Sequence, residues 1–397
     1  MSTGNVDHLA STRQTGRETR KVRFIAAGVM NTLAVQSDFR FRTNLSKPYM
    51  VLVEPTLRCP MACKFCDLPT DRTYPRQDEL PIQRWMEILS ELREFSPLIR
   101  SVYISGGEPF FRRDLIDLIE YAHEIGLGTR TLTVGQFCNE ALLDRLLASP
   151  MEVLKFSLHS SQSDVHNALV GRDVFDRAVG AIRYLRSNGY QGRIGILCTA
   201  FAGNADHLAD VARFATDLGV DEILFRPLFG QTVANREPEL LLEEPAGGLE
   251  LLLQEAEYNP ECVVPDVSVL RRSVAELKAM RGSVSPIVDT DDQLDAIVGL
   301  ADGTFRPPSG CHMMYEGIYI KPNGNIDACG HLALGVLGNV AERAVGEVLR
   351  SSEAYEVRHG VSRRCACDGN VFLNRTAAQR RALAIDVLRD RKRGGRS

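Results

Sequence analysis

The chain has 397 residues, 44% apolar and 25% charged, so it is long enough for more than one domain and can bury a large core. Its 47 basic residues nearly balance 51 acidic ones, so the formal charge of -4 gives no reason to expect nucleic acid or an anionic membrane as the main partner. The early apolar run from Phe24 to Met30 is too short to span a membrane. We expect a cytoplasmic protein, whose ten cysteines indicate metal ligation more than disulfides.

We interpret residues 1–45 as an N-terminal arm. The composition of about the first 22 residues is typical of a disordered segment. Between residues 46 and 230, short apolar runs alternate with segments of helical periodicity. Six strands alternating with five or six helices predict a parallel α/β sheet with fewer repeats than the eight of a closed TIM barrel. The predicted strands begin at Tyr49, Ser101, Thr129, Val153, Arg193 and Glu222, and the helices near Ile82, Arg113, Asn139, Val174 and Ala205.

A compact cysteine array directly follows the first predicted strand. Cys59, Cys63 and Cys66 have C-x3-C-x2-C spacing, with Phe65 just before the third cysteine. Three thiolates on one loop can hold three corners of a cubane iron-sulfur cluster and leave the fourth iron open to a substrate or cofactor. A zinc knuckle is the alternative, but it normally needs a fourth Cys or His nearby, and His8 is the only earlier histidine.

This array resembles the signature of the radical S-adenosylmethionine (SAM) superfamily. The resemblance implies a partial (β/α)6, TIM-like barrel and a [4Fe-4S] cluster with three Cys ligands. It also implies that the open iron chelates the amino and carboxylate groups of SAM. One electron from the cluster then cleaves SAM to methionine and a 5'-deoxyadenosyl radical, which requires a flavodoxin- or ferredoxin-type electron donor.

The turn after the second predicted strand supports this resemblance. It reads Gly106, Gly107, Glu108, Pro109, about 40 residues after the cysteine array. The glycines lack Cβ atoms where the backbone must pass close to a ligand, so a bulkier residue at Gly107 is expected to block SAM and spare the iron. In the family, this turn contacts the methionyl amino group of SAM.

Further positions in the barrel are assigned to SAM or substrate by the same resemblance. Ser157 occupies the place of a ribose-binding polar residue, and Arg172, with Arg177 as the alternative, would pair with the SAM carboxylate. The segment from Phe225 to Leu228 would lie beside the adenine. His159 is either a substrate contact, a proton relay or a structural histidine.

A second cysteine set, Cys311, Cys329, Cys365 and Cys367, follows in residues 310–368. The first two flank an alternating segment with Asn323-Gly324 at its centre, which predicts a β-hairpin. The pattern resembles the twitch domain, the shorter relative of the SPASM domain, and implies one auxiliary [4Fe-4S] cluster. A structural zinc site with four cysteine ligands remains the alternative.

Two segments remain outside these motifs. We interpret residues 231–309 as a linker that also covers the barrel mouth, with a helix from Val267 to Met280, and residues 369–397 as a helix with a basic tail. Cys198 and Cys138 fit as buried small apolar residues. Cys262, in the linker, is a candidate hydrogen-atom donor to a substrate radical, as in some epimerases of the superfamily.

The sequence therefore predicts a radical SAM enzyme with a twitch-like auxiliary domain. Our first hypothesis is hydrogen abstraction from a small polar substrate, such as a sugar, aminocyclitol or nucleoside, in specialised-metabolite or antibiotic biosynthesis. The first alternative is a peptide maturase acting on a ribosomally made precursor. The second is a non-catalytic iron-sulfur electron-transfer or sensor protein, which the GGEP turn disfavours because an electron carrier needs no SAM pocket.

Overall fold

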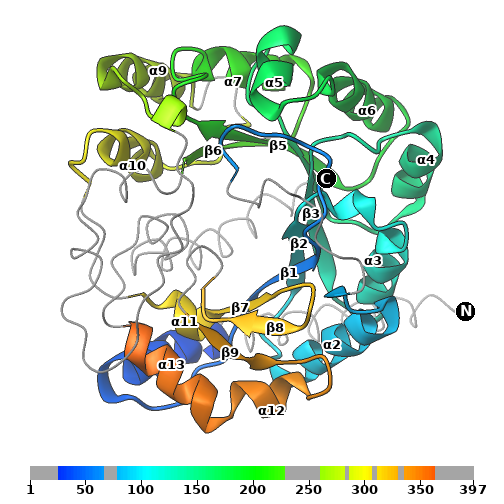
Figure 1. Cartoon of the computed structure of the whole chain (residues 1–397), viewed down its shortest axis with the longest axis vertical. Coiled ribbons are helices and arrows are strands. Elements are labelled where there is room, and N and C mark those ends of the chain that lie inside the picture. The colour runs from blue at the N-terminus through cyan, green and yellow to red at the C-terminus, as the bar shows by residue number, and fades with distance from the viewer. Residues whose placement is uncertain are drawn as a thin grey trace, which may run out of the picture.

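A computed structural model describes residues 26–66, 78–228, 260–281, 286–305, 311–329 and 335–362. The described strands form one curved nine-stranded sheet in the order β6-β5-β4-β3-β2-β1-β7-β8-β9. Helices line its convex side (Figure 1). No helix among these residues combines the length and apolarity needed to cross a bilayer.

Six parallel strands form the barrel, in the number and places that the sequence predicts. Neighbouring strands pair consecutively from β1 to β6. This confirms the partial (β/α)6 barrel. The strands are β1 (Met50–Thr56), β2 (Ser101–Gly106), β3 (Gly128–Thr133), β4 (Val153–Ser157), β5 (Arg193–Ala200) and β6 (Glu222–Pro227).

The strands alternate between a core face and an interior face, as a sheet backed by helices requires. In β1, Val51 and Val53 are fully buried in the core that Trp85 shares, whereas Leu52 and Glu54 are only partly buried. The outer helices are α2 (Ile82–Phe95), α3 (Leu115–Glu124), α4 (Glu140–Ala148), α5 (Ser163–Val170), α6 (Phe175–Ser187) and α7 (Leu208–Asp217).

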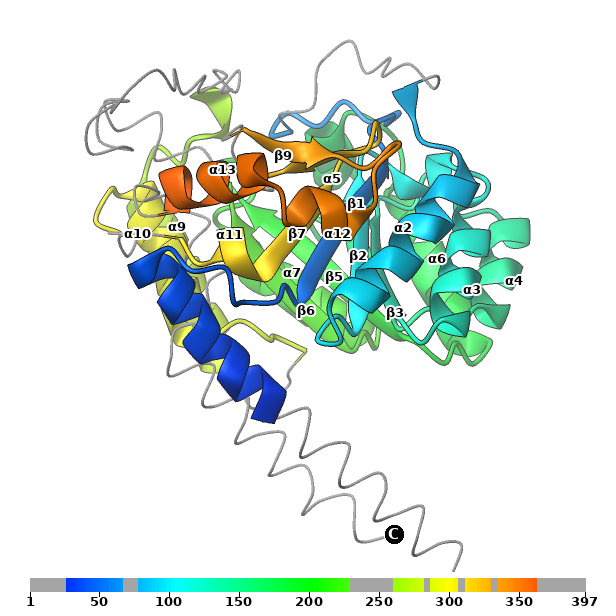
Figure 2. The same ribbon diagram turned by 90° about the horizontal axis from the view of Figure 1, so that it is seen from below.

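Two described helices within the first 230 residues were not predicted, nor were the helices that follow Met280. Helix α5 is short and ends at Gly171 in the left-handed conformation, with a φ of 70°. Another helix covers residues 26–41, inside the expected arm, and extends away from the barrel (Figure 2). Its buried polar residues fix the chain that follows: Asn31 exchanges two hydrogen bonds with the Lys47 backbone, and Asp38 accepts bonds from the backbone of Leu45 and Ser46.

The described part of residues 231–309 extends the helical layer. The predicted helix α9 (Val267–Met280) forms, and α10 (Asp291–Ala301) follows it after an isolated bridge between Ile287 and Ile223 of β6. Both helices lie on the outer side next to α7 and β6 (Figure 1). Residues 229–259 lie outside the described residues, so the predicted mouth cover stays a prediction.

The C-terminal part joins the barrel sheet directly. The predicted hairpin forms around Gly324, whose φ is 86°, and pairs Tyr319 with Asp327. Its first strand also pairs in parallel with β1, so that β1 has a barrel strand on one side and an auxiliary strand on the other. The elements are α11 (Met313–Glu316), β7 (Gly317–Ile320), β8 (Asn325–Asp327), β9 (Val336–Asn339), α12 (Val345–Leu349) and α13 (Ser352–Ser362).

Candidate functional site

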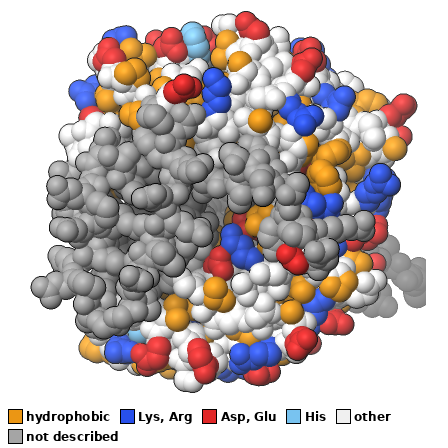
Figure 3. Space-filling model, viewed as in Figure 1, with side chains coloured by type: hydrophobic (Ala, Val, Ile, Leu, Met, Phe, Trp, Pro, Cys, Tyr) orange, Lys and Arg blue, Asp and Glu red, His pale blue; other side chains and the backbone are white. Residues whose placement is uncertain are grey.

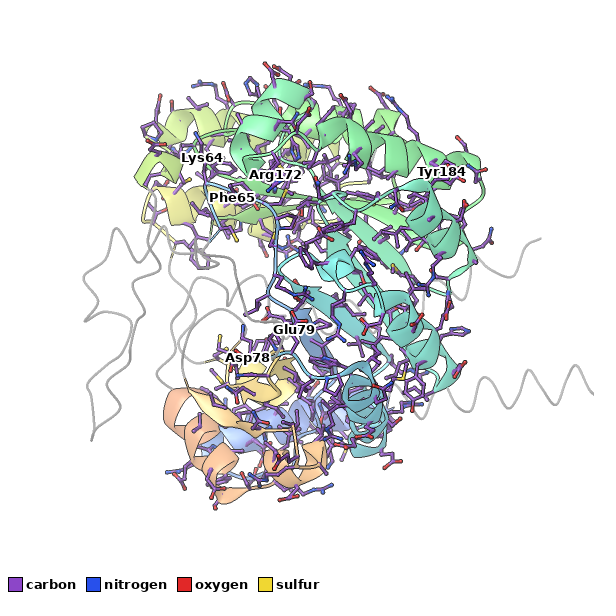
Figure 4. The ribbon with its side chains drawn as sticks, turned by 45° about the vertical axis from the view of Figure 1, so that its right-hand side comes forward. Lys64, Phe65, Asp78, Glu79, Arg172 and Tyr184 are labelled. Atoms are coloured by element: carbon purple, nitrogen blue, oxygen red, sulfur yellow. The ribbon has the colours of Figure 1, made fainter. Side chains whose placement is uncertain are left out.

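The first cysteine loop leaves the carboxyl end of β1 and is bound by backbone contacts to the end of α5. The amides of Ala62 and Lys64 donate to the carbonyls of Val170 and Leu169, at 3.0 and 3.1 Å. A Cβ on the next residue, Gly171, would lie 2.7 Å from the Ala62 Cβ. The close approach therefore requires the glycine, and Figure 4 shows Lys64 and Phe65 of the loop on the side of the barrel that carries α5.

The GGEP turn binds the start of the same loop. The Gly107 amide donates to the Thr56 carbonyl at 2.9 Å, and the Glu108 amide donates to the Arg58 carbonyl at 3.0 Å. A Cβ on Gly107 would lie 2.4 Å from the Arg58 carbonyl oxygen, and one on Gly106 would lie 2.2 Å from that of Thr56. The glycines are thus needed for contact with the cysteine loop and the end of β1. From the sequence alone, we expected them to leave room for a ligand.

Glu108 connects this turn to the next strand. Its carboxylate is 1% exposed and accepts hydrogen bonds from the Thr133 hydroxyl and the Val134 amide, each at 2.8 Å. Burial raises the pKa of Glu108 to about 7, although these hydrogen bonds oppose the shift. The ends of β1, β2 and β3 are therefore connected through one turn.

The three cysteines of this loop suit an iron-sulfur cluster. Cys59 and Cys63 are partly buried against Met61, Val170 and Val174, and Cys66 is exposed. Within the described ranges, no three His, Cys, Asp or Glu side chains converge on a single metal ion. A cubane does not require such convergence, because each thiolate binds a different iron.

Phe65 attaches the loop to the ends of β4 and β5. Its ring meets His159 edge-on at a centroid distance of 4.6 Å and Phe201 at 4.7 Å. Buried Asn204 holds this region together, since its amide nitrogen donates to the His159 and Thr199 carbonyls, both at 2.8 Å. The aromatic before the third cysteine is therefore a packing anchor for the loop.

His159 is held as a neutral ring. Its Nδ1 accepts from the Thr199 amide at 3.2 Å, which places the imidazole proton on Nε2. Burial, and secondarily the neighbouring His166, lower the pKa of His159 to about 3. The ring is thus uncharged at neutral pH and serves at least a structural role beside Phe65.

Of the other predicted barrel residues, Arg172 has a hydrogen bond to the loop, whereas the contacts of Ser157 and Arg177 are with other segments. Ser157 is the last residue of β4, opposite Leu197 of β5. Arg172 directs its Nε to the Pro60 carbonyl in the loop, and lies beside Phe65 in Figure 4. Arg177 donates to the Gln136 carbonyl at 2.6 Å.

Cys262, the candidate hydrogen-atom donor, is 2% exposed. Its thiol donates to the Lys64 carbonyl at 3.3 Å, and burial raises the pKa of this thiol. Cys262 therefore contacts the backbone of the cysteine loop. Cys138 and Cys198 are buried, as expected.

The second cysteine set is described only in part. Cys311 and Cys329 are both buried at the C-terminal hairpin, and Cys365 and Cys367 lie outside the described residues. The Cys311 amide donates to the Ser362 carbonyl at 2.6 Å. This bond holds Ser362, the last residue of α13, beside Cys311.

Comparison with protein-family models agrees with both sites. Residues 53–215 match the radical SAM superfamily, and residues 311–369 match the SPASM iron-sulfur cluster-binding domain. The chain is a radical SAM enzyme with a C-terminal SPASM domain. A [4Fe-4S] cluster that binds SAM and an auxiliary iron-sulfur cluster follow from these two domains, and the cysteines for both are present.

Solved structures with a similar fold include two that contain a bound peptide. SuiB of Streptococcus suis, bound to its precursor peptide SuiA, is 18% identical, with a TM-score of 0.61 over 83% of this chain and 71% of that one. The enzyme anSMEcpe, with bound AdoMet and the Cp18Cys peptide, is 15% identical, with a TM-score of 0.52 over 78% of this chain and 82% of that one.

Three polar contacts near the loop were not predicted. The Arg58 guanidinium pairs with Glu79, Arg112 donates to the Pro55 carbonyl, and Lys321 of the hairpin pairs with Glu54 of β1. Each joins residues far apart in the chain. Arg58 adjoins a cysteine ligand, but nothing in the local sequence identifies its partner.

Replacing Gly107 with Ala should damage iron binding as well as SAM binding, because the new Cβ would meet the backbone of the cysteine loop. We expect iron retention at the three-cysteine site and SAM affinity both to fall, as measured by iron analysis and equilibrium binding. Gly180→Ala in α6 is the control, since its Cβ meets nothing within 4 Å and Ala favours the helix. Native iron content in the Gly107 variant would refute the close-contact explanation.

The pKa of Glu108 predicts a pH-dependent stability. Because its pKa rises from 4.5 to about 7 on folding, its contribution to stability is fully present below pH 4.5 and is lost as the pH rises through about 7. Relative to Glu108→Gln, which stays neutral, the native protein should lose up to roughly 3 kcal/mol across this range. Denaturant unfolding of cluster-free protein at several pH values tests this, and parallel curves for the two proteins would contradict it.

Proposed function

We propose that this enzyme is a peptide maturase that abstracts hydrogen from an unactivated carbon of a ribosomally made precursor. The observation that carries the proposal is the likeness to SuiB with its precursor peptide, which covers 83% of this chain. The anSMEcpe complex also contains a peptide. These neighbours favour the peptide alternative over the small polar substrate that the sequence analysis placed first.

The cofactors of such a reaction have matching residues in this chain. Cys59, Cys63 and Cys66 would hold the SAM-binding cluster, and the Gly106–Pro109 turn would contact the SAM amino group. When bound, the cluster and SAM supply a 5'-deoxyadenosyl radical, for which we expect a flavodoxin- or ferredoxin-type protein to provide the electron. The chain itself supplies a cysteine loop fixed by backbone hydrogen bonds, and its role is to orient the cofactor and the substrate.

The barrel strands carry a group of paired charges near the amino ends of β5 and β6. On the interior face, Glu222 of β6 pairs with Lys155 of β4 at 2.9 Å and with Arg193 of β5 at 3.2 Å. Burial is the main influence that lowers the pKa of Lys155. Charges of both signs are interspersed on the described surface of the face in Figure 3, with no continuous basic band.

Transfer of deuterium into 5'-deoxyadenosine identifies the substrate directly. We expect transfer from a deuterated precursor peptide encoded beside this gene, because the abstracted hydrogen is carried to the nucleoside. Mass spectrometry of the nucleoside measures it. Transfer from a sugar, aminocyclitol or nucleoside, with none from the peptides, would restore the small-molecule hypothesis.

Removing the auxiliary ligands separates stability from catalysis. A Cys365→Ala, Cys367→Ala protein should still form 5'-deoxyadenosine slowly with dithionite and SAM but give no modified peptide, because the auxiliary cluster handles an electron or orients the substrate. A melting curve measures the accompanying loss of stability, since metal binding in such a small unit is largely folding free energy. Normal product from a folded variant without its second cluster would refute the catalytic role.

A further inference from the structure

The start of the first cysteine loop is fixed by a buried ion pair that involves none of the cysteines. Arg58, which immediately precedes Cys59, forms two parallel bonds with Glu79, from Nε to Oε1 at 2.8 Å and from Nη2 to Oε2 at 3.0 Å. The Glu79 side chain is only 4% exposed. A bidentate guanidinium-carboxylate pair fixes direction as well as distance, so it orients Arg58.

The same carboxylate also holds the end of β1. Glu79 Oε1 accepts a hydrogen bond from the Thr56 hydroxyl, and that hydroxyl accepts one from the Arg58 amide at 3.1 Å. One carboxylate thus reaches both the backbone and the side chain of Arg58. Figure 4 shows Glu79 inside the barrel ring, on the side away from Phe65 and α5.

Arg58 passes this constraint to the GGEP turn. Its guanidinium carbon lies 4.4 Å from the centre of the Phe111 ring, and its carbonyl accepts the Glu108 amide at 3.0 Å. The cation-π contact and the backbone bond come from the same short segment, which begins at the turn and continues into Phe111. A displaced Arg58 would therefore disturb the turn and the cysteine loop together.

The residue after Glu79 connects the pair to the auxiliary domain. The Leu80 amide donates to the Pro322 carbonyl in the β7–β8 turn at 2.8 Å, and the Leu80 carbonyl accepts from Arg112 at 2.9 Å. Beside it, Lys321 of the same turn pairs with Glu54 of β1 at 2.7 Å. Glu79 thus lies between the hairpin of one domain and the cysteine loop of the other.

We propose that Glu79 is a positioning residue for the SAM-binding cluster, acting through Arg58 to set the start of the cysteine loop. Removing one partner of a buried ion pair leaves the other charge uncompensated, so Arg58 would be expected to leave its place. The proposal concerns the first cluster alone and holds whichever substrate the enzyme uses.

The test compares Glu79→Gln with Glu79→Asp in the full chain, reconstituted with iron and sulfide. Gln keeps the size but loses the charge, so we expect about tenfold weaker SAM binding, equivalent to about 1.4 kcal/mol. We also expect faster iron loss to a chelator and a shifted SAM-dependent EPR spectrum of the reduced protein. Asp keeps the charge on a shorter side chain and should restore these properties in part.

Glu87→Gln is the matched control. It removes an exposed acidic partner of Arg84 on α2 and should behave as the native protein. A purely structural role for Glu79 would lower the melting temperature and leave the EPR spectrum and SAM affinity of the folded fraction unchanged, which would overturn the proposal. If Glu79→Gln does not fold, Arg58→Lys is tested in its place, because it keeps the positive charge and loses the bidentate geometry. A native EPR spectrum and native SAM binding in Arg58→Lys would also overturn the proposal.

Discussion

The close backbone contact between the first cysteine loop and its neighbours is the constraint on which the rest of this structure depends. Because the thiols of the loop are the proposed iron ligands, other groups must fix the shape of the loop. Amides of the GGEP turn bind its beginning and carbonyls at the end of α5 bind its middle, while Phe65 packs against buried aromatic rings. The glycines at 106, 107 and 171 make these contacts possible, because a Cβ at any of them would collide with the loop or β1.

The second constraint is the continuity of the sheet across the two domains. Because β7 pairs with β1, the auxiliary hairpin and the cysteine loop both depend on the same strand. Polar contacts at the end of that strand, including the pair of Lys321 with Glu54, strengthen the junction. The auxiliary domain is therefore joined to the barrel through the sheet itself.

The parts of the fold that local pattern determines were predictable. Among the described residues, six apolar strand runs, the predicted barrel helices, the helix from Val267 to Met280 and the Asn323-Gly324 hairpin form where the sequence places them, because each depends on residues near one another in the chain. The helix predicted in residues 369–397 lies outside the described residues. The helix over residues 26–41 was missed because part of its buried face is polar, with Asn31 and Asp38 satisfied by backbone groups further along the chain. The pairing of β7 with β1 could not be predicted from the sequence, because tertiary packing decides which strands pair.

The sequence points to candidate ligands of the site but not to the residues that support them. The spacing of the cysteines and the GGEP turn single out candidate cluster and SAM residues, which stay predictions, whereas Glu79, Asn204 and Arg112 act through contacts with distant segments. Gly107 shows the same limit, because its role was read as room for a ligand and its nearest neighbour is the protein backbone.

Mössbauer spectroscopy of protein reconstituted with ⁵⁷Fe, before and after addition of SAM, tests the central claim most directly. Two complete ligand sets predict two cubanes, about eight irons per chain, with SAM altering one iron of one cluster only. A Cys59, Cys63, Cys66 triple Ala variant should retain the other cluster and show no response to SAM. Zinc in the second site, or a spectrum that SAM leaves unchanged in the native protein, would contradict the account.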